Sequence, residues 1–192
     1  MEKINLVRPD IIHTAMVVDY LKEHADNFEF EIHGGALIEK MDYEAWLKQL
    51  LNNSNSLTVN KEWVVSSTFF AIREDDNKLV GIIDIRHELN NFLRMYGGHI
   101  GCGIRPSERR KGYATQMMKM ALDYCRKIGL DKVMVACYKD NEASRNMIIR
   151  CGGVLEKEFL LSEIGEEEIA RLISNENNEI TKNTVQIFWI TL

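Results

Sequence analysis

The chain has 192 residues, with 24 lysine and arginine residues against 29 aspartate and glutamate residues, which gives a formal net charge of −5. This acidic balance argues against a protein that binds nucleic acid or an anionic membrane surface. No apolar run approaches the roughly 20 residues that span a bilayer, and the N-terminus lacks a signal-peptide core, so we expect a cytoplasmic protein with no membrane partner. The length suits one domain, and we expect residues 1–192 to form it.

The cysteine pattern indicates neither a disulfide framework nor a metal site. The chain has four cysteines, without C-x-x-C spacing or a nearby histidine cluster. They lie within predicted strands or helices, and we interpret them as small buried hydrophobic residues: Cys102, Cys125, Cys137 and Cys151.

The N-terminal part of the chain predicts a strand followed by two helices. Residues 4–7 can form a strand, and Pro9 suits the first turn of the helix that follows. We expect this helix to bury one apolar face, made of Ile11, Ala15, Val18 and Leu21. After a stretch without periodicity at residues 26–41, a second amphipathic helix is predicted for residues 42–52, with Asp42 as its N-cap.

The middle of the chain predicts three strands joined by short connections. Two β-rich runs, residues 63–73 and 79–87, flank the polar turn at residues 75–78. Residues 99–104 form another short strand, which Pro106 ends. Short connections between consecutive strands imply antiparallel neighbours.

The C-terminal part predicts alternating helices and strands. Apolar residues recur at helical spacing from Gly112, and Gly129 is the expected C-cap of that helix. A buried strand at residues 133–137 leads into a helix at residues 141–151.

Two further strands are predicted for residues 154–161 and 185–192. They enclose an acidic segment at residues 165–173, which we interpret either as a short helix or as a solvated loop. Phe188 and Trp189 on the last strand can cover a sheet edge or meet a partner, which leaves a homodimer open.

The turn that opens the helix after Gly112 contains the residues that indicate a binding site. Arg109, Arg110 and Lys111 place three positive charges beside this glycine. The first N–H groups of a helix lack internal partners and its dipole is positive there, so the turn attracts phosphate, and a glycine lets the backbone approach closely. The spacing matches neither G-x-x-x-x-G-K-S/T nor G-x-G-x-x-G.

The run Arg109-x-x-Gly112-x-Ala114 resembles the signature Q/R-x-x-G-x-G/A, with which the GNAT superfamily of acetyltransferases holds the pyrophosphate of acetyl-CoA. A strand precedes it, and a fifth strand then leads into a helix that opens with Asn141, as in that family. The resemblance covers residues 79–153 well and the flanking segments only by the order of their elements. It implies a GNAT-like α/β fold, with a twisted, mostly antiparallel mixed sheet of about seven strands, splayed between the fourth and fifth strands and flanked by helices.

The resemblance also implies cofactor-binding residues. The backbone of Cys102 and Ile104 would pair with the pantetheine amides. Asn141 and Ser144 would face the pantetheine arm near the thioester, although Asn141 can equally be an N-cap and no more. The pyrophosphate would be held by consecutive residues: Arg109, Arg110, Lys111, Gly112, Tyr113, Ala114 and Thr115.

The acid and the base of the reaction stay open. Many family members protonate the departing thiolate with a tyrosine at the position of Ile148, so here either another group acts or the thiolate leaves unassisted, with a pKa of about 8.5. Tyr138, at the end of the fifth strand, is our substitute candidate. Candidates for the base are His99, Glu88 and His87, but strand alternation places His99 on the face opposite the pantetheine-pairing residues unless a bulge intervenes.

The resemblance implies an N-acetyltransferase that moves the acetyl group of acetyl-CoA to a primary amine by direct attack in a ternary complex. One alternative is a catalytically silent sensor or regulatory module that binds acyl-CoA, which the missing tyrosine favours. Another is an unrelated α/β protein that binds a different phosphate compound at Gly112.

No motif names the acceptor, which we expect to be a small-molecule or peptide amine. In the family, variable segments build its pocket, which here are residues 26–60 and 160–185. Glu29, Glu31 and Glu39 can attract a cationic amine, or can be solvated surface residues.

Overall fold

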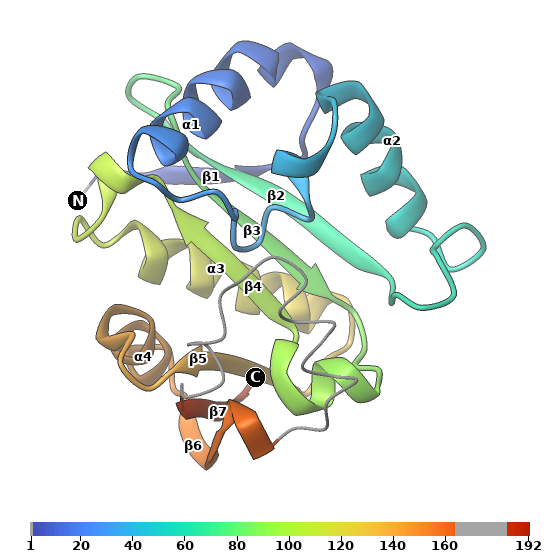
Figure 1. Cartoon of the computed structure of the whole chain (residues 1–192), viewed down its shortest axis with the longest axis vertical. Coiled ribbons are helices and arrows are strands. Elements are labelled where there is room, and N and C mark those ends of the chain that lie inside the picture. Colours follow the sequence, from blue (N-terminus) through green and yellow to red (C-terminus); the bar gives the residue numbers. More distant parts are fainter. Residues whose placement is uncertain (1, 164–183) are drawn as a thin grey trace.

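The computed structural model describes residues 2–163 and 184–192, whose strands form two sheets (Figure 1). The first sheet is antiparallel and has the order β1-β2-β3-β4. Its strands are β1 (Ile4–Val7), β2 (Ser66–Arg73), β3 (Leu79–Arg86) and β4 (Ile100–Ile104). The second sheet has the order β5-β7-β6, also antiparallel, with β5 (Lys132–Tyr138), β6 (Val154–Leu160) and β7 (Thr184–Thr191).

Helices cover both faces of the first sheet (Figure 1). On one face lie α1 (Thr14–Asp26) and α2 (Tyr43–Asn53), and on the other lies α3 (Tyr113–Lys127). The fourth helix, α4 (Glu142–Arg150), joins the same core as α3 and the second sheet. The mixed α/β class with antiparallel sheets and flanking helices is thus confirmed.

The central strands β2 and β3 are buried on both faces because helices lie on both sides of them. Alternate residues of β2 therefore enter opposite cores. Phe69 and Ala71 pack with α3, whereas Phe70 and Ile72 pack with α1 and α2.

The two sheets meet between β4 and β5, which are not paired as neighbouring strands. His99, just before β4, contacts Met134 of β5, and beyond this point β4 continues with β3 while β5 continues with β7. The predicted splay between the fourth and fifth strands is confirmed.

The buried face of α1 differs from the prediction. Ile11–His13 form a separate 3-10 turn with Asp10 as its N-cap, and α1 begins only at Thr14. This turn shifts the phase of the helix, so Val18 is 63% exposed. The buried residues of α1 are Val17, Tyr20 and His24.

The last strand also differs from the prediction, because β7 lies between β5 and β6 and covers no edge. Phe188 is buried against the core that contains α3 and α4. The predicted segment at residues 165–173 lies outside the described residues. Across the described ranges, no helix combines the length and the apolar character that crossing a bilayer requires.

Candidate functional site

The connection from β4 to α3 holds its backbone in a left-handed conformation at two positions. Arg110 has a φ of 64° and Gly112 a φ of 89°. Gly112 is the N-cap of α3, and within the described residues no side chain caps this helix. Successive N–H groups around left-handed residues form a concave surface that binds anions, and the positive end of the helix dipole adds to it. The geometry of residues 109–115 therefore suits a phosphate group.

The Arg109 side chain braces this turn. Its Nη1 and Nη2 donate to the two carboxylate oxygens of Glu29 at 2.6 and 2.5 Å, and its Nε donates to the Ile104 carbonyl at 3.0 Å. The pair with Arg109 holds the pKa of Glu29 below its ordinary value. Arg109 thus joins the end of β4 to the segment after α1.

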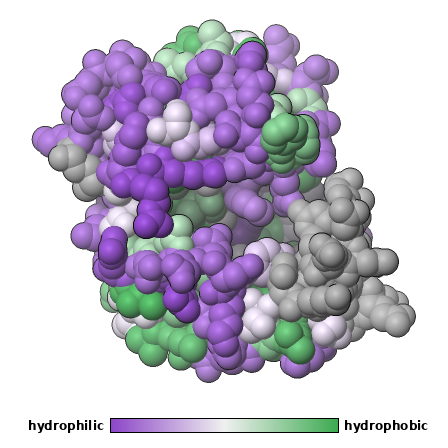
Figure 2. All heavy atoms as spheres, turned by 60° about the vertical axis from the view of Figure 1, so that its left-hand side comes forward, coloured by the Kyte–Doolittle hydropathy of each residue, from purple (hydrophilic) through white to green (hydrophobic). Residues whose placement is uncertain are grey.

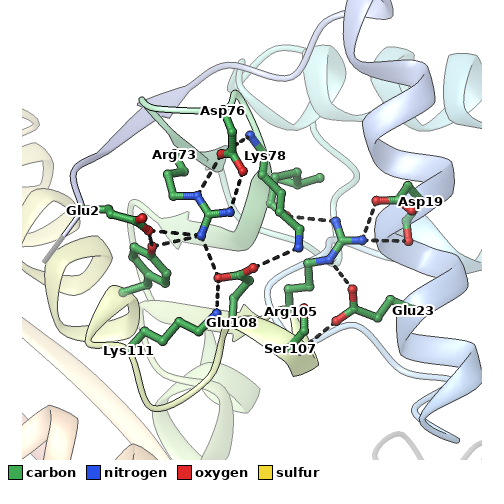
Figure 3. Close-up of polar contacts among 12 residues, drawn as sticks. Glu2, Asp19, Glu23, Arg73, Asp76, Lys78, Arg105, Ser107, Glu108 and Lys111 are labelled. Carbon is green, nitrogen blue, oxygen red and sulfur yellow. Dashed lines mark hydrogen bonds and ion pairs between the residues drawn. The ribbon is translucent and has the colours of Figure 1, made fainter.

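Glu108 anchors the turn from the other side (Figure 3). Its side chain accepts hydrogen bonds from Arg73 at 2.8 Å and from Lys78 and Lys111 at 2.9 Å each. Burial raises the pKa of Glu108, but these three cations outweigh it and hold the pKa at about 2. Tyr113 joins the cluster through a hydrogen bond from Arg73 to its hydroxyl at 3.1 Å.

Arg105 ties the same turn to α1 (Figure 3). It is 3% exposed and donates to Glu23 and to Asp19, each at 2.5 Å. The other Glu23 oxygen accepts the Ser107 N–H at 2.7 Å. Burial raises the pKa of Glu23, but the bonds from Ser107 and Arg105 prevail and hold it at about 2.

The remaining cation of the turn is Arg110. It is exposed and takes part in no ion pair within residues 2–163 and 184–192, whereas Arg109 and Lys111 are both paired. A phosphate ligand would therefore meet backbone N–H groups and one uncommitted guanidinium.

The pairing of β4 with β3 determines where its backbone groups point. Arg86 N–H donates to the His99 carbonyl, and Arg105 N–H donates to the Val80 carbonyl. The backbone N–H and C=O groups of the odd-numbered residues of β4 therefore point toward β3. Cys102 and Ile104 direct their N–H groups to the opposite edge, toward the gap before β5. Such an edge can pair with an extended amide chain.

The segment between α1 and α2 lies across β4. A Cβ at Gly34 would overlap the Gly101 carbonyl, and a Cβ at Gly103 would lie 2.8 Å from the His33 carbonyl. These glycines let two backbones touch, so the segment covers the face of β4 opposite α3. In Figure 2 the molecule is hollowed between its upper and lower parts, with hydrophilic side chains around the opening.

His99, a candidate base, is 6% exposed and bonded to β5. Its backbone N–H donates to the Met134 carbonyl at 2.8 Å, and its ring Nδ1 accepts the Met134 N–H at 2.9 Å. Burial lowers the pKa of His99 to about 4, and the charges of Arg94 and Arg86 contribute.

Tyr138, the candidate acid, is half-buried and bonded to a second tyrosine. Its hydroxyl lies 2.7 Å from the hydroxyl of Tyr96, which belongs to a π-helical turn, Leu93–Gly97. Turns of this kind often occur at functional sites.

Glu88 and His87 lie on the wall of an open hollow of about 920 Å³ between the end of α2 and the end of β3. Glu88 is exposed, while His87 Nε2 bonds to Ser67 Oγ at 2.9 Å. Burial lowers the pKa of His87, with a contribution from Arg8.

Asn141 is the N-cap of α4, because its Oδ1 accepts the Ser144 N–H at 3.0 Å. The Ser144 side chain makes a hydrogen bond with Cys137. Burial raises the pKa of the Cys137 thiol, and this hydrogen bond offsets part of the rise. Ser144 therefore lies beside β5, close to the gap between the sheets.

A model of the acetyltransferase (GNAT) family matches residues 36–152, more than half of the chain. The chain belongs to this family. As a member it is an acyltransferase with acetyl-CoA as its co-substrate. The residues present fit this molecule, since the turn at residues 109–115 suits its phosphates and the edge of β4 that is unpaired among the described strands suits its amides.

Solved structures of the family share the fold at low sequence identity. The microcin self-immunity acetyltransferase MccE, with acetyl-CoA and AMP, has a TM-score of 0.62 and 16% identity, over 100% of this chain and 94% of its own. RimL, a ribosomal alpha-N-protein acetyltransferase with coenzyme A, has a TM-score of 0.64 and 14% identity, over 99% and 94%. A chimera of the spermidine N-acetyltransferase SpeG from Vibrio cholerae and hSSAT has a TM-score of 0.60 and 16% identity, over 97% of this chain and 95% of its own. A comparison with curated proteins finds no match.

Ile148, at the position where many family members have a tyrosine, is fully buried in the core with α3. Sequence reasoning did not identify Asp19, Glu23 and Glu108 as carboxylates that hold the turn, nor Tyr96. It named Glu29 as a residue that can attract a cationic amine, whereas the structure pairs Glu29 with Arg109. For two of these carboxylates a signal exists, since Asp19 and Glu23 lie four residues apart on one helix face. Tyr96 has no such signal, because its position depends on a short helical turn in a connection.

Proposed function

We propose that this acetyltransferase moves the acetyl group of acetyl-CoA to a primary amine in a ternary complex. The proposal is supported above all by the edge of β4 opposite β3, which has no strand partner among the described residues and carries the N–H groups of Cys102 and Ile104, shortly before the turn at residues 109–115. The pantetheine arm would lie along this edge, with the pyrophosphate at residues 109–115 and the thioester nearer to His99.

Acetyl-CoA supplies an activated acetyl thioester. Attack by a neutral amine forms the N–C bond and breaks the C–S bond, and the thiolate takes up a proton. A backbone N–H on the free edge of β4 can donate to the carbonyl oxygen as charge develops on it. Tyr138 is the proposed donor of the proton to the thiolate, and a hydrogen bond from Tyr96 would stabilise the phenolate that this leaves.

For the base we propose Glu88, whose exposed carboxylate lines the hollow beside His87. His99 is a weaker candidate, because its Nδ1 already accepts the Met134 N–H and its low pKa disfavours protonation.

The acceptor is proposed to be a cationic amine. Glu39, on the segment that crosses β4, has a buried Oε2 with no hydrogen-bond partner among the described residues. Burial raises the pKa of Glu39, with a contribution from Glu31, and a cation beside it would restore its charge. The similarity to a spermidine acetyltransferase and to a ribosomal alpha-N-protein acetyltransferase supports an amine.

The test is titration calorimetry with acetyl-CoA, followed by thiol release against polyamines and peptides with free N-termini. We expect binding, turnover with a cationic amine, and a kcat about a hundredfold lower in Tyr138→Phe at unchanged acetyl-CoA affinity, as removal of a general acid predicts. Binding without turnover across the panel would favour the sensor alternative, and absence of binding would refute the phosphate-site assignment.

A further inference from the structure

The joint between the two sheets depends on one residue. Among the described residues, the hydrogen bonds that join the start of β4 to β5 both involve His99: its backbone N–H donates to the Met134 carbonyl, and its side-chain Nδ1 accepts the Met134 N–H. In a regular ladder a backbone carbonyl would accept that N–H. Here an imidazole nitrogen replaces it.

The backbone around His99 explains this replacement. Gly98 has a φ of 63°, and a Cβ there would lie 2.7 Å from the Met134 carbonyl oxygen, so the close approach of β4 to β5 requires glycine. The His99 carbonyl turns away and accepts the Arg86 N–H of β3 at 2.8 Å. His99 therefore bonds β5 on one side and β3 on the other.

The imidazole is held firmly in this position. It is 6% exposed, and the Trp189 ring of β7 meets it in an edge contact with 6.2 Å between the centroids. Because Nδ1 accepts a hydrogen bond, the neutral ring carries its proton on Nε2. Burial and the nearby arginines keep the ring neutral and the Nδ1 lone pair available.

We infer that His99 is a positioning residue that ends the ladder between β4 and β5 at Met134 and so sets the opening of the acetyl-CoA cleft. Because the acceptor is a side-chain atom, the next residue of β4 cannot continue the ladder of backbone hydrogen bonds. Pairing with β5 therefore stops there, and the edge at Cys102 and Ile104, unpaired among the described strands, begins. The inference rests on the proposed location of the pantetheine arm in this gap.

The test compares three substitutions of His99. In His99→Asn, Oδ1 can occupy the place of Nδ1 and accept the Met134 N–H, whereas the acceptor in His99→Gln lies one bond further out and His99→Leu has none. We expect amide hydrogen exchange at Met134 to stay slow in His99→Asn and to become fast in the other two. The acetyl-CoA Kd should stay near the wild-type value in His99→Asn and rise about tenfold in His99→Gln and His99→Leu, as the loss of a buried hydrogen bond predicts.

His13 provides the matched control. It is 8% exposed, and its Nδ1 accepts the Asp10 N–H at 3.0 Å, far from the joint between the sheets. His13→Leu removes the same kind of bond, so it should lower the melting temperature without changing the acetyl-CoA Kd.

Several outcomes would overturn the inference. Equal losses of kcat in all three His99 variants, at unchanged Kd and Met134 protection, would make His99 a catalytic base. Wild-type affinity in His99→Gln would show that the acceptor does not set the cleft, and this variant decides the matter even if His99→Leu fails to fold. A wild-type protein that does not bind acetyl-CoA would refute the proposed function, while Met134 exchange would still decide whether His99 is the joint.

Discussion

The cationic side chains near the phosphate-binding turn are largely neutralised by the protein itself. Arg109 is paired with Glu29 and Lys111 with Glu108. Their charges hold the turn in shape, because each links it to another segment. In the proposed phosphate site, affinity would therefore depend mainly on backbone N–H groups, which require the conformation at Gly112.

At this residue scale we predict that Gly112→Asp abolishes acetyl-CoA binding in a folded protein. Aspartate strains the left-handed backbone at a φ of 89° and places a negative charge where the phosphates would bind. The matched control is Gly129→Asp at the other end of α3, where φ is 85° and a Cβ would meet nothing within 4 Å. Calorimetry should show wild-type affinity for the control, and binding by Gly112→Asp would contradict the site.

At the scale of elements, charged contacts fix the turn between α1 and the hairpin of β2 and β3. Arg105 reaches Asp19 and Glu23 of α1. Glu108 reaches Arg73 at the end of β2 and Lys78 just before β3. The turn is thereby positioned by contacts with elements on both sides.

We predict that Glu108→Gln lowers the free energy of unfolding by about 2 kcal/mol, because a carboxylate that is 3% exposed loses its charge beside three cations. Acetyl-CoA binding should weaken as the turn loosens. Asp76→Asn is the control. Asp76 also pairs with Arg73 but is half-exposed, so this substitution should lower the free energy of unfolding by under about 1 kcal/mol. Equal losses of unfolding free energy in the two variants, measured by urea unfolding, would contradict the role of Glu108.

For the whole molecule, we expect the joint between the sheets to be sensitive to acid, because of His99. The His99 ring is faced by Arg86 from β3, by Arg94 from the π-helical turn and by Trp189 from β7. Its pKa falls from 6.5 to about 4 on folding, so the unfolded chain binds the proton more readily. Stability from this group is complete above pH 6.5 and is lost as the pH falls toward 4.

We predict a loss of about 3 kcal/mol from this group between those two pH values. Glu108 and Glu23 act at lower pH, since their pKa values of about 2 lie below the ordinary 4.5, and their stabilisation is lost as the pH falls from 4.5 toward 2. Urea unfolding at several pH values should show a shallower decline above pH 4 in His99→Asn than in the wild type. If the free energy of unfolding declined equally with pH in both proteins, the assignment of this acid sensitivity to His99 would be refuted.

Local spacing was sufficient to predict the turn at Gly112 and the helix that follows it. Arg109, Gly112 and Ala114 lie within six residues of one another, and apolar residues that recur at helical spacing in α3, such as Met117 and Ala121, are buried. Both features follow from backbone geometry over a few residues, which the sequence displays directly.

Only the tertiary structure decided which carboxylates hold that turn and what His99 does. Arg105 and Glu23 are 82 positions apart, and His99 and Met134 are 35 apart. The same limit applied to α1, whose buried face depended on the 3-10 turn before it. Such contacts depend on how strands and helices pack, and periodicity within one segment does not specify a partner in another. The sequence by itself therefore determined the family signature and most elements, whereas packing decided how β4 meets β5 and which side chains of the turn are paired.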